Sequence, residues 1–183
     1  KISMSIEDVT INTNLFGEYN VENIASAICI GKYFGLNNIE IKEGVESYIP
    51  NNNRSQILEK GSNKIILDAY NANPTSMKLT LVNFNEMDEE NKIVFLGDMY
   101  ELGESSHEMH QDIVEAIEKM NFDQSYLLGD LFSKTKFSSK IKAFSTLEDL
   151  NNSMKLKEIS NATILIKGSR GMQLEKILDF IIS

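Results

Sequence analysis

Two runs of consecutive apolar residues constrain the fold of this chain more than any other feature of its sequence. Residues 93–96 read Ile-Val-Phe-Leu and residues 164–166 read Ile-Leu-Ile, with no polar side chain at alternate positions. A strand with this pattern is buried on both faces, as happens when helices cover both sides of a parallel sheet. The chain is therefore expected to contain an α/β domain.

Similar short runs recur along the second part of the chain and alternate with segments of helical periodicity. We expect strands at residues 56–59, 64–67, 92–96, 125–128, 140–144 and 163–166. We expect helices at residues 76–87, 107–120, 146–154 and 172–182. This alternation predicts a Rossmann-like domain with a mostly parallel sheet.

The first 50 residues follow a different pattern. Period-2 alternation over residues 2–11 predicts the tail of a sheet, and helical spacing predicts helices at residues 20–34 and 39–48. The stretch Pro-Asn-Asn-Asn at residues 50–53 has the composition of a linker. We therefore expect residues 1–50 to be the end of one domain and residues 51–183 to form a second domain.

Charge and composition exclude several classes of protein. The chain carries 18 Lys and Arg against 27 Asp and Glu, a net charge of -9, which disfavours nonspecific binding of nucleic acid. No stretch approaches the ~20 apolar residues that a membrane helix needs, so no membrane insertion is expected. The single cysteine, Cys29, fits a reducing compartment, and its place in a helical pattern predicts a small buried side chain.

Polar side chains gather where the expected strand at residues 64–67 ends and the next helix begins. Ligands of open α/β sheets bind at the carboxyl ends of strands, where helix N-termini present free N–H groups. One Asp or Asn at such a place is commonly only a turn or cap residue. Five polar groups at one strand end point to a site instead, and they are Asp68, Tyr70, Asn71, Asn73 and Ser76.

Two other strand ends carry charged residues. Asp98 and Glu101 flank a glycine-bounded turn after residue 96, but two acids do not make a metal-ligand set, so no metal site is predicted. Lys167, Ser169 and Arg170 stand between the strand at residues 163–166 and the expected last helix. Two cations and a hydroxyl beside free N–H groups predict an anion site, and a solvated turn is the alternative.

Four stretches resemble motifs of the Mur ligase family, in particular of its members that add D-alanyl-D-alanine. They are Gly-Glu-Tyr-Asn-Val-Glu-Asn at residues 17–23, Asp-Ala-Tyr-Asn-Ala-Asn-Pro at 68–74, Gly-Asp-Met-Tyr-Glu-Leu-Gly at 97–103 and Lys-Gly-Ser-Arg at 167–170. A further match lies at residues 105–110, where His110 fits the family position better than His107. The seven-residue pattern at 97–103 is the most specific of these.

The resemblance implies an ATP site. Asn20 and Asn23 correspond to amides associated with the adenine, although Asn20 is also a plausible helix N-cap. Tyr19 stands where the family usually has His, and its ring is expected to pack on the base. Arg54 corresponds to an arginine that reaches the ATP phosphates, a role that suits a forked guanidinium, and a solvated side chain is the alternative. Asp68 would accept hydrogen bonds from the ribose hydroxyls.

The resemblance also implies roles around the reacting groups. Asn71 and Asn73 would face them. On the motifs alone, we assign Asp98 and Glu101 to orient the dipeptide ammonium or receive its proton, and Arg170 with Ser169 to hold the dipeptide carboxylate. That last contact would belong to the same anion site as Lys167. Tyr70 and Ser76 would line the substrate crevice.

The implied whole protein is a monomeric cytoplasmic enzyme of peptidoglycan precursor synthesis. It would use ATP and Mg²⁺ to join D-alanyl-D-alanine to UDP-N-acetylmuramoyl-tripeptide. The chain contains no Gly-x-x-x-x-Gly-Lys-Ser/Thr, so ATP and Mg²⁺ are expected to be held mainly by an upstream part, and the chain alone is expected to be inactive. Two alternatives stay open: another amino-acid-adding ligase of this kind, or a stand-alone nucleotide-binding domain without catalysis.

Overall fold

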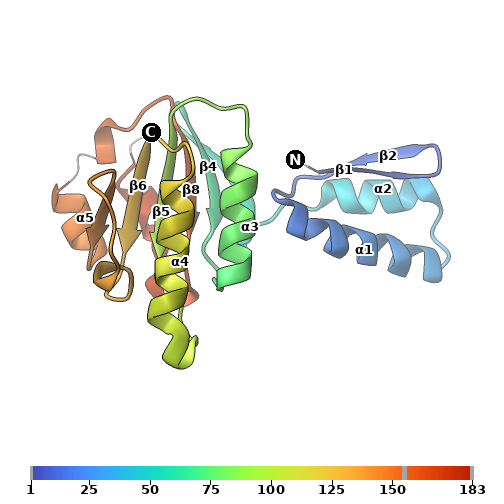
Figure 1. Ribbon diagram of the computed structural model, residues 1–183. Coiled ribbons are helices and arrows are strands. Elements are labelled where there is room, and N and C mark those ends of the chain that lie inside the picture. Colours follow the sequence, from blue (N-terminus) through green and yellow to red (C-terminus); the bar gives the residue numbers. More distant parts are fainter. Residues whose placement is uncertain (1, 154–155, 182–183) are drawn as a thin grey trace.

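The strands expected after residue 54 pair into one six-stranded sheet in the computed structural model of the chain, which describes residues 2–153 and 156–181 (Figure 1). In sheet order they are β3 (Gln56–Lys60), β4 (Asn63–Asp68), β8 (Thr163–Lys167), β5 (Lys92–Gly97), β6 (Gln124–Leu128) and β7 (Ile141–Phe144). Only β3 and β4 are antiparallel, and the other neighbours are parallel. The predicted α/β fold with a mostly parallel sheet is confirmed.

Helices and short 3-10 turns cover both faces of this sheet. They are α3 (Pro74–Asn85), η2 (Gly103–Ser105), α4 (Ser106–Glu118), η3 (Phe132–Lys134), α5 (Leu147–Ser153), η4 (Leu156–Glu158), η5 (Arg170–Met172) and η6 (Leu174–Asp179). Alternate residues of β5 enter two separate cores: Val94 packs with α3 and α4, whereas Phe95 packs with α5, η4 and η6. Burial on both faces explains why this strand has no polar position.

The predicted helix at residues 172–182 is wrong. The chain forms the 3-10 turns η5 and η6 instead, and residue 182 lies outside the described residues. Between the two turns Gln173 has a left-handed backbone, with φ of 51°. A left-handed residue cannot continue an α-helical hydrogen-bond ladder, so the apolar spacing of this segment is met by short turns. The helix predicted at residues 146–154 is α5, and residue 154 also lies outside the described part.

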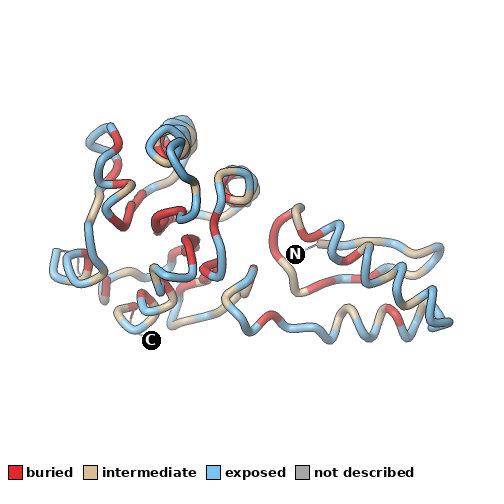
Figure 2. The backbone as a smooth tube through the Cα atoms, turned by 90° about the horizontal axis from the view of Figure 1, so that it is seen from below, coloured by how far each residue is buried: buried red, intermediate tan, exposed pale blue. Residues whose placement is uncertain are grey.

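The first part of the chain forms a hairpin and two helices beside the α/β domain (Figure 1). They are β1 (Ser3–Ile6), β2 (Val9–Asn12), η1 (Glu18–Asn20), α1 (Val21–Tyr33) and α2 (Asn38–Ser47). Few of its residues are buried, and α1 buries only Ile24 (Figure 2). The predicted burial of Cys29 is therefore wrong: the thiol is exposed, because nothing in the described residues covers that face of α1.

Among the helices of the described residues, none combines the length and the apolar character needed to cross a membrane.

Candidate functional site

A cleft of about 260 Å³ lies at the carboxyl end of β4, where the first part of the chain meets the α/β domain. Its lining residues are Tyr19, Asn20, Asn23, Arg54, Ser55, Asp68, Tyr70, Asn71, Asn73, Ser76 and Lys167. Ser55 is the one lining residue that the sequence analysis did not single out. Residues from four distant stretches thus share one cleft, as the strand-end argument expects.

Asp68 and Lys167 form a buried ion pair at the base of the cleft. β4 and β8 are parallel neighbours, and their register places these two residues opposite each other. The Lys167 Nζ lies 2.5 Å from Asp68 Oδ2, and the two residues are only 2% and 7% exposed. Lys167 is therefore neutralised by Asp68 and does not present a free cation at the surface.

Ser55 and Tyr19 complete the coordination of the Asp68 carboxylate. The Ser55 backbone N–H donates to Oδ1 at 3.1 Å, and the Tyr19 hydroxyl donates to Oδ2 at 3.3 Å. Burial, with the nearby Asp68 charge as a second cause, raises the pKa of Tyr19 far above its ordinary value. The Tyr19 hydroxyl is therefore neutral and donates a hydrogen bond. It is already bonded to Ser55 and Asp68 within the protein.

Asn20 connects the first part of the chain to the same network. It precedes α1, as an N-cap does, but its side chain makes no cap bond. Instead its Nδ2 donates to the Phe16 carbonyl at 2.7 Å and to Ser55 Oγ at 3.0 Å, and its Oδ1 accepts from Asn23 Nδ2 at 3.1 Å. The side chain of Asn20 thus links the two parts of the chain.

The turn after β4 is held by its own side chains. Asn73 Oδ1 accepts from the Ser76 N–H at 2.8 Å, and Ser76 Oγ accepts from the Asn73 N–H at 3.2 Å, a capping box at the start of α3. Pro74 occupies the first turn of α3, where its missing N–H has no helical partner to lose. Asn71 Oδ1 accepts from the Ala72 N–H at 2.9 Å. These residues therefore fulfil the turn and cap roles that were the structural alternative, and their contacts with substrates stay predictions.

Tyr70 stands at the mouth of the cleft with two guanidinium groups near its ring. The Arg54 Cζ lies 3.8 Å and the Arg170 Cζ 5.9 Å from the ring centroid. Arg170 also pairs with Glu175 at 3.4 Å. Both arginines are exposed at this end of the cleft, and Glu175 offsets part of the charge of Arg170.

The turn after β5 does not present Asp98 to the cleft. Asp98 is buried, and its Oδ2 and Oδ1 accept from the Leu131 and Phe132 N–H groups at 3.0 and 2.9 Å. This geometry argues against the predicted contact between Asp98 and the dipeptide ammonium. Glu101 is exposed in a left-handed conformation, with φ of 63°, and does not line the cleft either.

The buried His110 side chain fixes the turn after β5. Its Nε2 accepts from the Met99 N–H at 3.0 Å, and its Nδ1 lies 2.6 Å from the Ser106 carbonyl, so the proton is assigned to Nδ1. The ring is fully buried and packs edge-on against Phe132. The sequence placed His110 in a motif but offered no role, because its partner is a backbone N–H that only the fold brings near.

The predicted anion site at Lys167, Ser169 and Arg170 stays a prediction, but two of its three side chains already have partners within the protein. Lys167 is paired with Asp68, and Ser169 Oγ accepts from the Tyr100 N–H at 2.9 Å. No α-helix follows, since η5 is a three-residue 3-10 turn. Of the three side chains, only Arg170 is exposed and turned towards the cleft mouth.

Comparison with known proteins explains why these stretches converge. The sequence profile of the family described as "Mur ligase, glutamate ligase domain" matches residues 53–170. This chain belongs to the Mur ligase family. The UDP-N-acetylmuramoyl-tripeptide–D-alanyl-D-alanine ligase of Borreliella burgdorferi is 30% identical over 173 residues, which cover 90% of this chain and 37% of that protein.

Two solved Mur ligases have a similar fold. Crystal structure II of MurF from Acinetobacter baumannii has a TM-score of 0.80 at 27% identity, over 93% of this chain and 39% of that chain. MurF ligase from Thermotoga maritima, solved in complex with ADP, has a TM-score of 0.78 at 21% identity, over 98% and 44%. This chain thus spans less than half the length of the Mur ligases that it matches.

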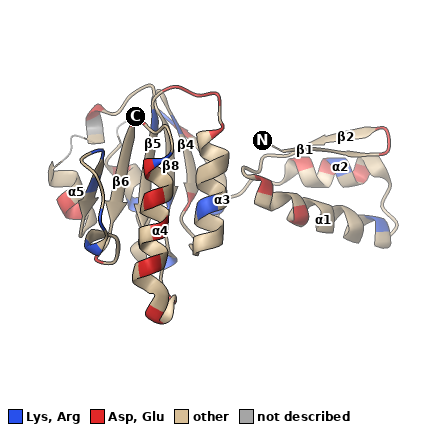
Figure 3. Cartoon of the chain, viewed as in Figure 1, with Lys and Arg blue, Asp and Glu red and all other residues tan. Residues whose placement is uncertain are grey.

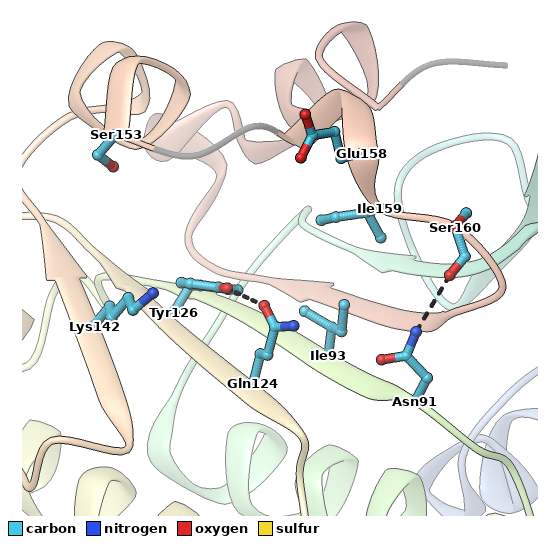
Figure 4. Close-up of a pocket in the computed structure, with 9 residues that line it drawn as sticks. All are labelled: Asn91, Ile93, Gln124, Tyr126, Lys142, Ser153, Glu158, Ile159 and Ser160. Carbon is cyan, nitrogen blue, oxygen red and sulfur yellow. Dashed lines mark hydrogen bonds between the residues drawn. The ribbon is translucent and has the colours of Figure 1, made fainter.

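A second cleft, of about 430 Å³, lies at the opposite end of β5 and β6 (Figure 4). Asn91 precedes β5 and Gln124 begins β6, and they face Ser153 and Glu158 across the opening. None of the residues that resemble Mur ligase motifs lines it. The cleft at the end of β4 is therefore the candidate site of this Mur ligase domain.

Proposed function

We propose that this chain is the C-terminal part of an ATP-dependent ligase that joins D-alanyl-D-alanine to UDP-N-acetylmuramoyl-tripeptide. The observation that carries the proposal is the single cleft in which Asp68, Lys167, Tyr19 and Asn20, from three motif stretches, meet. The names of the related ligases of the family support the same reaction. The protein would act as a cytoplasmic monomer.

The ATP half of the reaction uses the lower part of the cleft. Asn20 and Asn23 would contact the adenine, Tyr19 would pack beside it, and Arg54 would bind the phosphates. Asp68 retains acceptor capacity beyond its present donors, because a carboxylate offers about four lone-pair directions. A ribose diol is a donor that fits this acceptor.

Mg²⁺ would be held elsewhere in the complete protein. No group of three His, Cys, Asp or Glu in residues 2–153 and 156–181 has a geometry that could hold a metal ion. Two carboxylates of the motifs, Asp98 and Glu101, do not converge, and Asp98 uses both oxygens on backbone donors. The residues present therefore do not form a magnesium site by themselves.

The second half of the reaction joins the dipeptide to an activated tripeptide. After ATP has phosphorylated the tripeptide carboxylate, the dipeptide amine forms a bond to the acyl carbon, and phosphate leaves with the electrons of the broken C–O bond. Arg170 would bind the dipeptide carboxylate, since it is the exposed cation of its motif. Of the two carboxylates on the turn after β5, Glu101 is the exposed one and would accept the proton of the amine, although it does not line the cleft in this structure.

The exposed apolar surface of the first part supports the proposal that residues 1–50 end a larger ATP-binding domain. A groove of about 420 Å³ between α1 and α2 is lined mainly by apolar residues, including Ile24, Leu36 and Ile41. On α1, Ile30 and Tyr33 are exposed, and so is Phe34, directly after the end of that helix. Apolar surface of this extent is usually covered by further protein.

A ligase assay on the complete gene product tests the proposal. Phosphate release from ATP should require UDP-N-acetylmuramoyl-tripeptide and D-alanyl-D-alanine together, with L-alanine as the matched control. The 183-residue chain alone should be inactive and bind ATP weakly, because it lacks a P-loop motif. Turnover with L-alanine but not with the dipeptide would favour another amino-acid-adding ligase, and no turnover with any acceptor would favour the non-catalytic alternative.

A further inference from the structure

Tyr70 brings together two arginines that are far apart in the sequence. Arg54 stands before β3 and Arg170 follows β8, yet their guanidinium carbons lie 3.8 and 5.9 Å from the centroid of the same ring. Both distances fall within the ~6 Å range in which a guanidinium is attracted to an aromatic ring. The two guanidinium groups are therefore separated by no more than the sum of these distances.

The ring is the main partner that orients Arg54. In the part of the chain that the structure describes, Arg54 has no carboxylate within salt-bridge distance, whereas Arg170 has Glu175 at 3.4 Å. A free arginine side chain has many rotamers and repels a second cation, so two such groups do not stay together unaided. Contact with the Tyr70 ring restricts the rotamers of Arg54 and gives each guanidinium an attraction that offsets their mutual repulsion.

Tyr70 can hold these groups because its own backbone is anchored on both sides. The preceding Asp68 is fixed by Lys167, and the following Asn71 side chain accepts from the Ala72 N–H. Ala69 and Ala72 are buried, while Tyr70 is 40% exposed. The ring therefore projects from a fixed turn into the mouth of the cleft.

The segment that carries Arg170 is anchored by the turn after β5. Tyr100 donates its hydroxyl to Met172 Sδ at 2.8 Å and its backbone N–H to Ser169 Oγ at 2.9 Å. A Cβ added at Gly171 would come within 2.9 Å of the Tyr100 ring, so the two segments are in close contact. Arg170 thus approaches Tyr70 from a position fixed by a third motif.

The two arginines also provide positive charge in an acidic molecule. The chain has a net charge of -9, and acidic residues recur along α4 (Figure 3). Within the cleft, Lys167 is neutralised by Asp68. Anionic substrates approaching this site would therefore depend for local attraction on Arg54 and on Arg170, whose charge Glu175 partly offsets.

We propose that Tyr70 is a positioning residue that holds Arg54 and Arg170 as one anion-binding unit. This inference rests on the proposed function and deepens it: Arg54 binds the ATP phosphates, Arg170 binds the dipeptide carboxylate, and Tyr70 keeps the two groups adjacent. Binding the two anions side by side holds the ATP phosphates and the dipeptide in one cleft, where both steps of the reaction take place. Loss of the ring should therefore weaken both substrates at once.

Steady-state kinetics of the complete enzyme test whether loss of the Tyr70 ring weakens the binding of ATP and of the dipeptide together. Each exposed cation–π contact corresponds to about a 2- to 5-fold change in binding, so Tyr70→Leu should raise the KM of ATP and of the dipeptide by about that factor each. The KM of the tripeptide and the melting temperature should stay near wild type. Tyr70→Phe keeps the ring and should restore both KM values, and Phe137→Leu is the matched control at an aromatic residue of the α/β domain that is 36% exposed and does not line the cleft.

Binding of inorganic tripolyphosphate to the 183-residue chain separates this inference from the proposed function. NMR signals of the arginine side chains should shift on titration, and Tyr70→Leu should weaken the binding while Tyr70→Phe should not. This result would support the positioning role even if the complete protein were not a ligase. If Tyr70→Leu binds tripolyphosphate like wild type, or changes only one KM, the inference is overturned.

Discussion

Replacing Lys167 by Met tests the buried ion pair at the base of the cleft. The substitution keeps a long unbranched side chain but removes the ammonium group, and so leaves the Asp68 carboxylate buried without a cation. Lys167 is 2% exposed and lies 2.5 Å from Asp68, which is itself only 7% exposed, so little water can reach the carboxylate to replace the lost partner. The variant should therefore lose stability through an uncompensated buried charge.

The expected loss is about 3 kcal/mol. Removing one partner of a buried pair typically costs about 3–5 kcal/mol, and the low end applies because Asp68 keeps the Ser55 and Tyr19 donors. Total stabilities of domains are about 5–15 kcal/mol, so the loss would be a large fraction of the whole. In the variant Lys167→Met with Asp68→Asn, the buried charge is gone, and most of the stability should return.

Urea unfolding of the 183-residue chain, followed by circular dichroism, measures this effect. Lys78→Met is the matched control, because Lys78 is exposed on α3 and pairs with an exposed Asp112, a contact worth about 0–1 kcal/mol. The reasoning is refuted if Lys167→Met loses no more stability than Lys78→Met. It is also refuted if the double variant is less stable than Lys167→Met alone.

Four further changes test other parts of the site. In the complete enzyme, Arg170→Lys should raise the dipeptide KM roughly 10-fold and leave the ATP KM near wild type, since lysine cannot bind a carboxylate bidentately; an unchanged dipeptide KM in a stable protein would contradict this. Tyr19→Phe should lower the urea midpoint of the 183-residue chain by the equivalent of about 1 kcal/mol, because its hydroxyl bonds are lost. His110→Leu should cost about 1–3 kcal/mol by leaving a buried N–H unpaired, and the exposed His107→Leu should cost little. Cys29 of the 183-residue chain should react with a thiol reagent without denaturant and be protected in the complete protein, and slow reaction in the short chain would contradict its exposure.

The strands were predictable because their residues carry the information locally. Residues 93–96, for example, include no polar residue, so both faces of this strand must be buried to keep its side chains away from water. The capping box at Asn73 and Ser76 is equally local, since the two side chains bond each other's backbone. The order of strands in the sheet and the antiparallel direction of β3 were not predicted.

Two predictions were wrong because the spacing of apolar residues does not show how the rest of the chain packs around a segment. The apolar positions after residue 172 fit a helix, but Gln173 adopts a left-handed backbone and the segment folds as two short turns. Cys29 fits a buried helical position, but the face of α1 that carries it has no neighbour in the described part of the chain. Periodicity predicts which side chains share a face and not whether another element covers that face.

The sequence by itself determined that Asp68, Lys167 and Asp98 stand at strand ends, because each follows an apolar run directly. Only the tertiary structure decided what each side chain does there. β8 enters the sheet between β4 and β5, and its register places Lys167 against Asp68 across 99 residues of sequence. The same packing turns Asp98 to the N–H groups of Leu131 and Phe132, at the start of η3, and away from the cleft. Partners of this kind depend on strand order and register, which long-range packing fixes and local sequence does not record.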